Sequence, residues 1–80
     1  MKDLTPCDVE IRILADGTLE PLRFTVQGAW KNVAQVGRNW SDGLGDHWLV
    51  MQSTGEVYDL ARSPDGLWRI SRASGPARYA

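Results

Sequence analysis

Apolar and charged residues alternate near the start of the chain with a period of two, the spacing of a β-strand that buries one face. Val9, Ile11 and Ile13 share that face, and charged residues lie between them. Asp16-Gly17 follows. Asp-Gly is typical of a two-residue hairpin turn, because glycine tolerates the positive φ that the turn requires. The sequence therefore predicts a strand that leads into a hairpin.

The same rhythm of alternation and short turns continues along the rest of the chain. Further strands are expected over residues 22–26, 30–36, 47–52, 56–61 and 67–72. No stretch of about ten residues has the 3.6-residue period of an amphipathic helix. The prediction is a single all-β domain over residues 8–73, between a flexible N-terminus (1–7) and a flexible tail (74–80).

Five or six short antiparallel strands favour a small sheet that curls into a partly closed barrel, because a flat open sheet would leave its edges exposed. Val57 is a weaker core candidate, since alternation puts it on the face opposite Tyr58 and Leu60. The main core residues are expected to be Val9, Ile11, Ile13, Phe24, Val33, Val36, Leu49, Met51, Tyr58, Leu60, Trp68 and Ile70.

Four tryptophans, Trp30, Trp40, Trp48 and Trp68, stand out in a chain of 80 residues with one cysteine and therefore no internal disulfide. Each indole can bury about 200 Å², which is roughly 5 kcal/mol of gross burial before ordering entropy is subtracted. Their expected role is packing in the core or at its rim. The sequence assigns the stability of this small domain mainly to such side-chain packing.

The longest stretch that reads as irregular runs from Gly37 to Asp46 and holds three of the eight glycines. Loops on a rigid scaffold often carry function, and Trp40 lies inside this one. An exposed tryptophan there would suit a contact with a partner. The alternative is that Trp40 folds back as a lid over the open end of the barrel.

Charge and composition exclude several classes of protein. Nine Lys and Arg against ten Asp and Glu give a net charge of −1, so the chain is not a general polycation that binds nucleic acid through net charge alone. No run approaches the roughly 20 apolar residues needed to cross a bilayer. The first residues lack the apolar centre of a signal peptide. We expect a cytoplasmic protein without a membrane partner.

The residues offer little support for catalysis or a cofactor. Cys7 and His47 are single representatives of their types, which excludes a structural zinc site made from cysteine and histidine. Asp46 adjoins His47, but neighbouring strand residues point to opposite faces. The carboxylates of Asp42 and Asp46 are expected to be solvated in the loop rather than to hold a metal. The expectation is a protein that is not an enzyme and that has no metal or cofactor.

The order of several short motifs resembles a small bacterial all-β domain family of unknown function. They are Val9-Glu10-Ile11-Arg12, Asp16-Gly17, Phe24-x-x-x-Gly28, Val33-x-x-Val36-x-x-x-Trp40, Val57-Tyr58-Asp59-Leu60 and Gly66-Leu67-Trp68-Arg69-Ile70. The family occurs as stand-alone proteins and near proteins related to Y-family translesion DNA polymerases. The resemblance covers about residues 8–72 and implies an association with DNA damage tolerance. Gln27 and Ala29 depart from it, because relatives usually carry arginine around this glycine.

The resulting hypothesis is a non-catalytic binding or accessory module, linked through the resemblance to DNA repair or translesion synthesis. It would act through an unidentified protein partner or weak nucleic-acid contacts, with Trp40, Arg62, Arg69 and Arg72 as the contact residues. Arginine suits phosphate contacts next to an aromatic ring. The alternative for these arginines is that their stems cover apolar surface. The alternative for the whole chain is a homo-oligomeric structural protein, such as a homodimer, with no nucleic-acid role.

Overall fold

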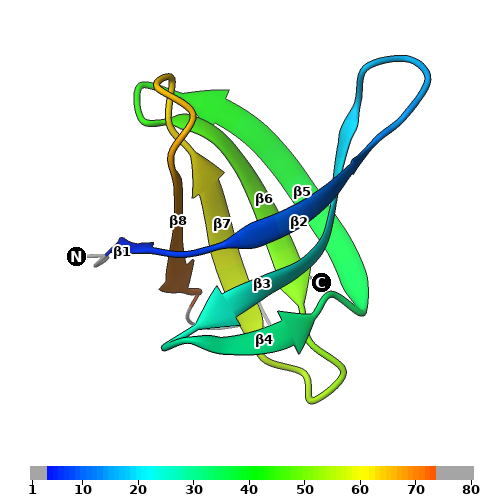
Figure 1. The fold of residues 1–80 in the computed structure, drawn as a ribbon, viewed down its shortest axis with the longest axis vertical. Coiled ribbons are helices and arrows are strands. Elements are labelled where there is room, and N and C mark those ends of the chain that lie inside the picture. Colours follow the sequence, from blue (N-terminus) through cyan, green and yellow to red (C-terminus); the bar gives the residue numbers. More distant parts are fainter. Residues whose placement is uncertain (1–3, 74–80) are drawn as a thin grey trace.

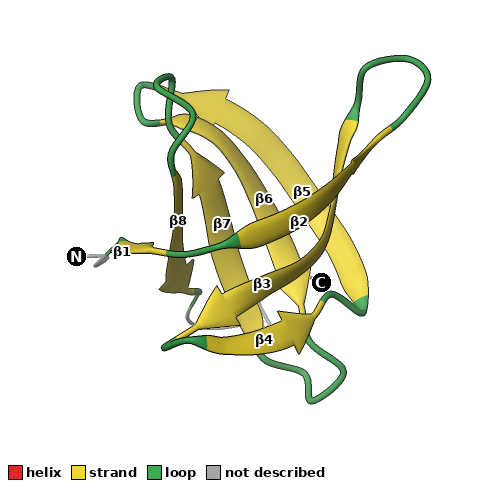
Figure 2. Cartoon of the chain, in the orientation of Figure 1, coloured by secondary structure: helices red, strands yellow, loops and turns green. Residues whose placement is uncertain are grey.

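The computed structural model describes residues 4–73, all in strands, turns or short connections (Figures 1 and 2). The strands are β1 (Thr5–Pro6), β2 (Val9–Ile13), β3 (Leu19–Val26), β4 (Ala29–Asn32), β5 (Gln35–Asp42), β6 (Gly45–Met51), β7 (Val57–Arg62) and β8 (Trp68–Arg72). Within these described residues, no helix is long and apolar enough to cross a membrane. The predicted all-β class is confirmed.

The strands form two antiparallel sheets. One has five strands in the order β1-β8-β7-β6-β5, and the other has three in the order β2-β3-β4. The number of strands exceeds the expectation because the predicted strand over residues 30–36 is divided between β4 and β5, and because the chain forms β1 before β2. β1 pairs with β8 through Thr5 and Pro6, within the segment that was expected to be flexible. The expected flexible tail, 74–80, lies outside the described residues.

The core lies where the three-stranded sheet crosses the five-stranded sheet (Figure 1). Phe24 of β3 is fully buried, and its ring centroid lies 5.3 Å from that of Tyr58 on β7. We call the face of the five-stranded sheet that packs against Phe24 the inner face, and the opposite face the outer face. The buried inner cluster consists of Phe24, Trp48, Val50, Tyr58, Leu60 and Ile70.

A second, smaller cluster contains Leu49, Val57 and Ala73, with Trp40 and Met51 packed against it. Because Leu49 alternates with Trp48 and Val50, β6 is buried on both faces. The sequence prediction placed Leu49 and Met51 in the core and Trp48 in the core or at its rim, but omitted Val50. A strand buried on both faces has no polar face, so alternation cannot identify its core side.

The prediction that Ile13 and Val36 are buried in the core is wrong. Ile13 is 66% exposed and Val36 is also exposed. Ile13 ends β2 where the β2–β3 hairpin extends away from the two sheets (Figure 1), so the hairpin tip has no opposing layer to bury it. The tryptophans also differ from one another: Trp48 is buried, whereas Trp30 is 44% exposed.

The predicted loop from Gly37 to Asp46 is instead mostly strand. β5 and β6 are joined by a two-residue turn, Gly43-Leu44. β5 reads as a loop because it lies at the end of its sheet, where seven of its eight residues are exposed and few are apolar. Its register with β6 also shifts between Val36 and Asn39.

The β5–β6 hairpin depends on a glycine at position 45. Gly45 has φ of +123°, and a Cβ there would lie 2.2 Å from the backbone oxygen of Arg62. Gly43, in the same turn, has open space around the corresponding position. We expect Gly45→Ala to lower the free energy of unfolding by about 3 kcal/mol or more, because steric overlap adds to backbone strain.

Gly43→Ala is the matched control, with an expected change within about 0.5 kcal/mol. Urea unfolding of the two variants and the wild type measures both effects. Equal stabilities for the two variants would contradict this account of the turn.

Candidate functional site: the His47 cluster

The four residues predicted as contacts do not form one surface. Arg62 pairs in register with Trp68, and Arg72 pairs with Tyr58, so both lie on the inner-face side but at opposite ends of β7 and β8. Arg69 alternates with these positions on β8 and lies on the outer side. The outer side also carries Trp40, which is separated from Arg69 by β6 and β7. The arginines therefore do not converge on one phosphate or strand of nucleic acid.

Two of the arginines have local partners. A guanidinium nitrogen of Arg72 lies 3.2 Å from a carboxylate oxygen of Glu56, and the guanidinium carbon lies 5.7 Å from the centre of the Tyr58 ring. Arg69 donates a hydrogen bond of 3.4 Å to the Ser63 hydroxyl. Arg72 thus places its charged group over an aromatic ring.

The structure instead assembles a polar cluster around His47 on the outer face. The His47 side chain is only 4% exposed. Its Nδ1 lies 2.9 Å from an oxygen of Asp59, and its Nε2 lies 2.9 Å from an oxygen of Asp42. Asp59 is 1% exposed, whereas Asp42 is 44% exposed. One imidazole therefore connects a buried carboxylate to a solvent-facing one.

The sheet register explains this arrangement. His47 stands opposite Trp40 on β5 and Ala61 on β7. Asp42 is two residues beyond Trp40, and Asp59 is two residues before Ala61, so alternation puts both carboxylates on the His47 face as diagonal neighbours. They flank the imidazole from opposite directions along the strands. Each ring nitrogen consequently has its own carboxylate.

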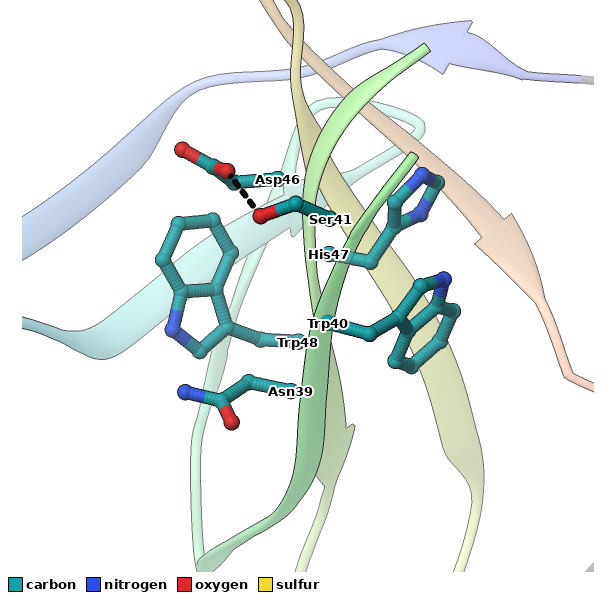
Figure 3. Close-up of a pocket in the computed structure, with 6 residues that line it drawn as sticks. All are labelled: Asn39, Trp40, Ser41, Asp46, His47 and Trp48. Atoms are coloured by element: carbon teal, nitrogen blue, oxygen red, sulfur yellow. Dashed lines mark hydrogen bonds between the residues drawn. The ribbon is translucent and has the colours of Figure 1, made fainter. Parts of the chain in front are cut away.

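Trp40 completes the cluster by stacking on the imidazole. The two ring centroids are 4.8 Å apart, and the ring planes differ by 3°. Figure 3 shows Trp40 and His47 on one side of the β5–β6 hairpin, and Asn39, Ser41, Asp46 and Trp48 on the other. The alternative interpretation placed Trp40 as a lid over an open end of the barrel. Trp40 instead lies on the outer face of the sheet, stacked on His47.

The environment favours the charged form of His47. Burial lowers its pKa, but the hydrogen bonds and negative charges of Asp59 and Asp42 together outweigh this effect, so the pKa is raised above its usual value. The pKa of Asp42 is lowered by a hydrogen bond from the Leu44 amide and by its hydrogen bond with His47. The protonated form of the cluster is thus an imidazolium between the side chains of Asp59 and Asp42.

In its protonated form His47 cannot act as a general base. Both His47 nitrogens already have carboxylate partners, and a protonated imidazole has no lone pair to accept a proton. Cys7 packs instead against the inner core. Burial, followed by the charge of Asp8, raises the pKa of its thiol to about 11, which keeps the sulfur protonated and weakly nucleophilic at neutral pH.

A hollow of about 390 Å³ opens beside this cluster and is lined by Leu4, Trp40, Asp42, Leu44, His47 and Asp59. The two carboxylates in its wall face the imidazole, each 2.9 Å from one of its ring nitrogens. The two carboxylates lie on opposite sides of the imidazole ring, so these three side chains do not point toward one position where an ion could bind. Among residues 4–73, no group of three or more His, Cys, Asp and Glu side chains is arranged to hold a metal ion.

Sequence reasoning missed this cluster because it paired His47 with its neighbour Asp46. Those two side chains do point to opposite faces (Figure 3), and Asp46 accepts a hydrogen bond of 2.6 Å from Ser41. The useful signal was Asp42, which reaches His47 across a two-residue turn. Asp59 could be found only from the register of β6 with β7.

Comparisons with known protein families, curated proteins and solved structures find no match for this chain.

The raised pKa of His47 predicts a loss of stability above neutral pH. Below about pH 6.5 histidine is protonated in both the unfolded and folded chains, and the contribution of His47 is fully present. As the pH rises, the unfolded chain releases the proton first, so the free energy of unfolding falls until the pH passes the raised pKa. Asp42 acts in the opposite sense: its contribution is lost as the pH falls below about 4.

Urea unfolding at several pH values between about 5.5 and 7.5 measures the His47 effect. The upper limit stays below about pH 8.5, where the Cys7 thiol of the unfolded chain titrates. His47→Gln should remove most of the dependence on pH in this window. The same slope in the variant and the wild type would show that His47 is not its source.

Proposed function

We propose that the chain is a non-catalytic binding module that receives an extended segment of a partner protein along the edge of β5 that faces away from β6. The observation that carries the proposal is the position of β5 at the end of the five-stranded sheet. Among residues 4–73 no strand pairs with its outer edge, and every β5 residue except Trp40 is exposed. An open edge supplies unpaired backbone donors and acceptors for an added strand.

The usable part of this edge is short. The register shift between Val36 and Asn39 disturbs the first half of β5, and bulges of this kind protect sheet edges from non-specific pairing. The second half, Asn39 to Asp42, pairs regularly with β6. Trp40 and Asp42 are held there by His47. A strand fixed in this way has little conformational entropy to lose when a partner binds.

Protein contact is favoured over nucleic-acid contact because the predicted arginines are dispersed and Arg72 is paired with Glu56. Any binding to single-stranded DNA would be weak and strongly dependent on salt. The proposed link to translesion synthesis in the bacterial cytoplasm is supported by the resemblance of the sequence motifs.

A partly closed barrel is also proposed for the arrangement of the two sheets. Its support lies in the segment that connects β1 to β2. The Cys7 amide donates a hydrogen bond of 3.2 Å to the Trp68 carbonyl, and the Thr25 amide donates one of 3.0 Å to the Asp8 carbonyl. One continuous segment is thus bonded to both sheets, which limits how far they can separate.

A photo-reactive amino acid at Asn39 tests the proposed partner site. In cells of the native host, Asn39 should give a discrete protein adduct, because it lies on the regular part of the edge. The control position is Arg12, which is exposed on β2 in the other sheet. Equal adducts from both positions would indicate random collisions and contradict a specific edge.

Titration of labelled single-stranded DNA tests the nucleic-acid alternative. We expect no saturable binding at about 20 mM salt, where counterion release most favours association. Saturable binding that is lost in the combined variant R62Q/R69Q/R72Q would restore the sequence-based contact residues and contradict the preference for protein contact.

A homodimer is the second candidate, favoured by the charges on β5. Arg38 and Asp42 are equally spaced on either side of Trp40. Antiparallel pairing of two copies around Trp40 would therefore place each Arg38 opposite the partner's Asp42. Sedimentation at increasing concentration tests this arrangement. A single species at the monomer mass throughout would remove it and leave an unlike protein as the partner.

A further inference from the structure

The two carboxylates beside His47 differ in a way that has a dynamic consequence. Asp59 lies deep in the sheet, whereas nearly half of the Asp42 side chain is in contact with solvent. Asp42 is the last residue of β5, and Asp59 is in the interior of β7. The imidazole therefore connects the end of an edge strand to the middle of the sheet. Its Nε2 contact is the side-chain link between Asp42 and the neighbouring strand β6.

The protonation state determines how many of these contacts His47 can make. An imidazolium has an N–H on both nitrogens and can donate to both carboxylates. A neutral imidazole has one N–H, so its other nitrogen presents a lone pair to a carboxylate. At the 2.9 Å separation of either pair, two acceptors repel each other. Loss of one proton must therefore disrupt one of the two contacts.

Burial decides which contact is lost. Removing a hydrogen bond costs more at a buried carboxylate than at an exposed one, so the remaining N–H stays on Nδ1, facing Asp59. Asp42 can turn toward water at a small cost and still accept a hydrogen bond from the Leu44 amide, now 2.8 Å away. Loss of positive charge also weakens the attraction between the imidazole and the face of Trp40.

We propose that protonated His47 is a latch that holds the end of β5 on the sheet, and that its deprotonation releases Asp42 and loosens the edge strand. The latch concerns the protein alone. Its consequence, that a partner binds the edge more tightly at mildly acidic pH than at alkaline pH, rests on the function proposed above.

Other charged groups near His47 define what must be controlled. Asp42 lies on β5, together with Arg38, whose guanidinium carbon is 5.5 Å from the centre of the Trp40 ring. Asp59 lies on β7. Arg69 on β8 pairs with Ala61 on β7, and Ala61 in turn pairs with His47. A guanidinium group is not deprotonated in proteins. A change at this cluster as the pH rises above the usual histidine value of about 6.5 is therefore assigned to His47.

Nuclear magnetic resonance of the ¹⁵N-labelled histidine ring gives the first test. After deprotonation the proton should remain on Nδ1, because that nitrogen faces the buried carboxylate. The neutral form would then be the Nδ1–H tautomer. A neutral Nε2–H tautomer would keep the contact to Asp42 and overturn the proposal.

Hydrogen exchange of the isolated protein gives the second test. Each rate is divided by that of the same amide in an unstructured peptide, which removes the direct effect of pH on exchange. Protection of the slowly exchanging amides among Trp40–Asp42 should fall by up to about tenfold per pH unit through the His47 titration, because opening is linked to loss of one proton. Amides of the β7–β8 pair should show a smaller change.

Two variants separate the latch from a general effect of charge. Asp42→Asn removes the carboxylate at the exposed end and should make protection of these amides independent of pH. Asp46→Asn removes a carboxylate next to His47 in sequence but on the opposite face, and should behave as the wild type does. A pH-dependent loss that survives in Asp42→Asn, or its absence in the wild type, would refute the latch.

These measurements use no partner, so their outcome is independent of the cross-linking result. A latch without an Asn39 adduct would leave the conformational device intact and contradict the proposed function. An Asn39 adduct without a pH-dependent loss of protection would support the proposed function and contradict the latch.

Discussion

Placing an imidazolium inside a β-sheet is the constraint on which the outer face depends. An isolated buried charge is strongly unfavourable, so His47 requires the negative groups on both sides of its ring. The register of β5 with β6 supplies Asp42, and the register of β6 with β7 supplies Asp59. A slip of either pair by one residue would move a carboxylate to the other face of the sheet. The polar cluster thereby opposes slippage of two neighbouring pairs of strands.

The two faces of the five-stranded sheet are stabilised by different interactions. The inner face is apolar and is covered by the three-stranded sheet, with Phe24 fully buried between them. The outer face combines a small apolar cluster around Leu49 and Val57 with the His47 ion pairs. Burial on both faces allows a short chain to enclose more side chains than a sheet with one solvated face would.

The central part of the fold was accessible from the sequence because its strands alternate and its turns are explicit. The alternation around Tyr58 and Leu60 and around Trp68 and Ile70 predicted β7 and β8, and both are confirmed. β5 was not accessible. Its exposed residues show no apolar alternation, and the glycine at position 45 marks a close approach to Arg62 rather than the loop that was predicted.

The candidate site was less predictable than the fold, since it depends on contacts across strands. The rule that neighbouring strand residues face opposite sides correctly separated Asp46 from His47, yet it could not indicate which distant carboxylates would replace Asp46. Trp40 was selected for the wrong environment: it is a half-buried strand residue stacked on His47, not a loop anchor. Arg62, Arg69 and Arg72 were grouped by closeness in sequence, whereas alternation and strand length separate them in space.

The tip of the β2–β3 hairpin is not part of this packing. It carries exposed Ile13 and Leu14 and extends beyond both layers (Figure 1). Few side chains elsewhere rely on it, and the entropy of closing a loop grows only slowly with length. The tip is therefore the natural place to lengthen the chain or graft a foreign epitope while the two layers keep their mutual packing.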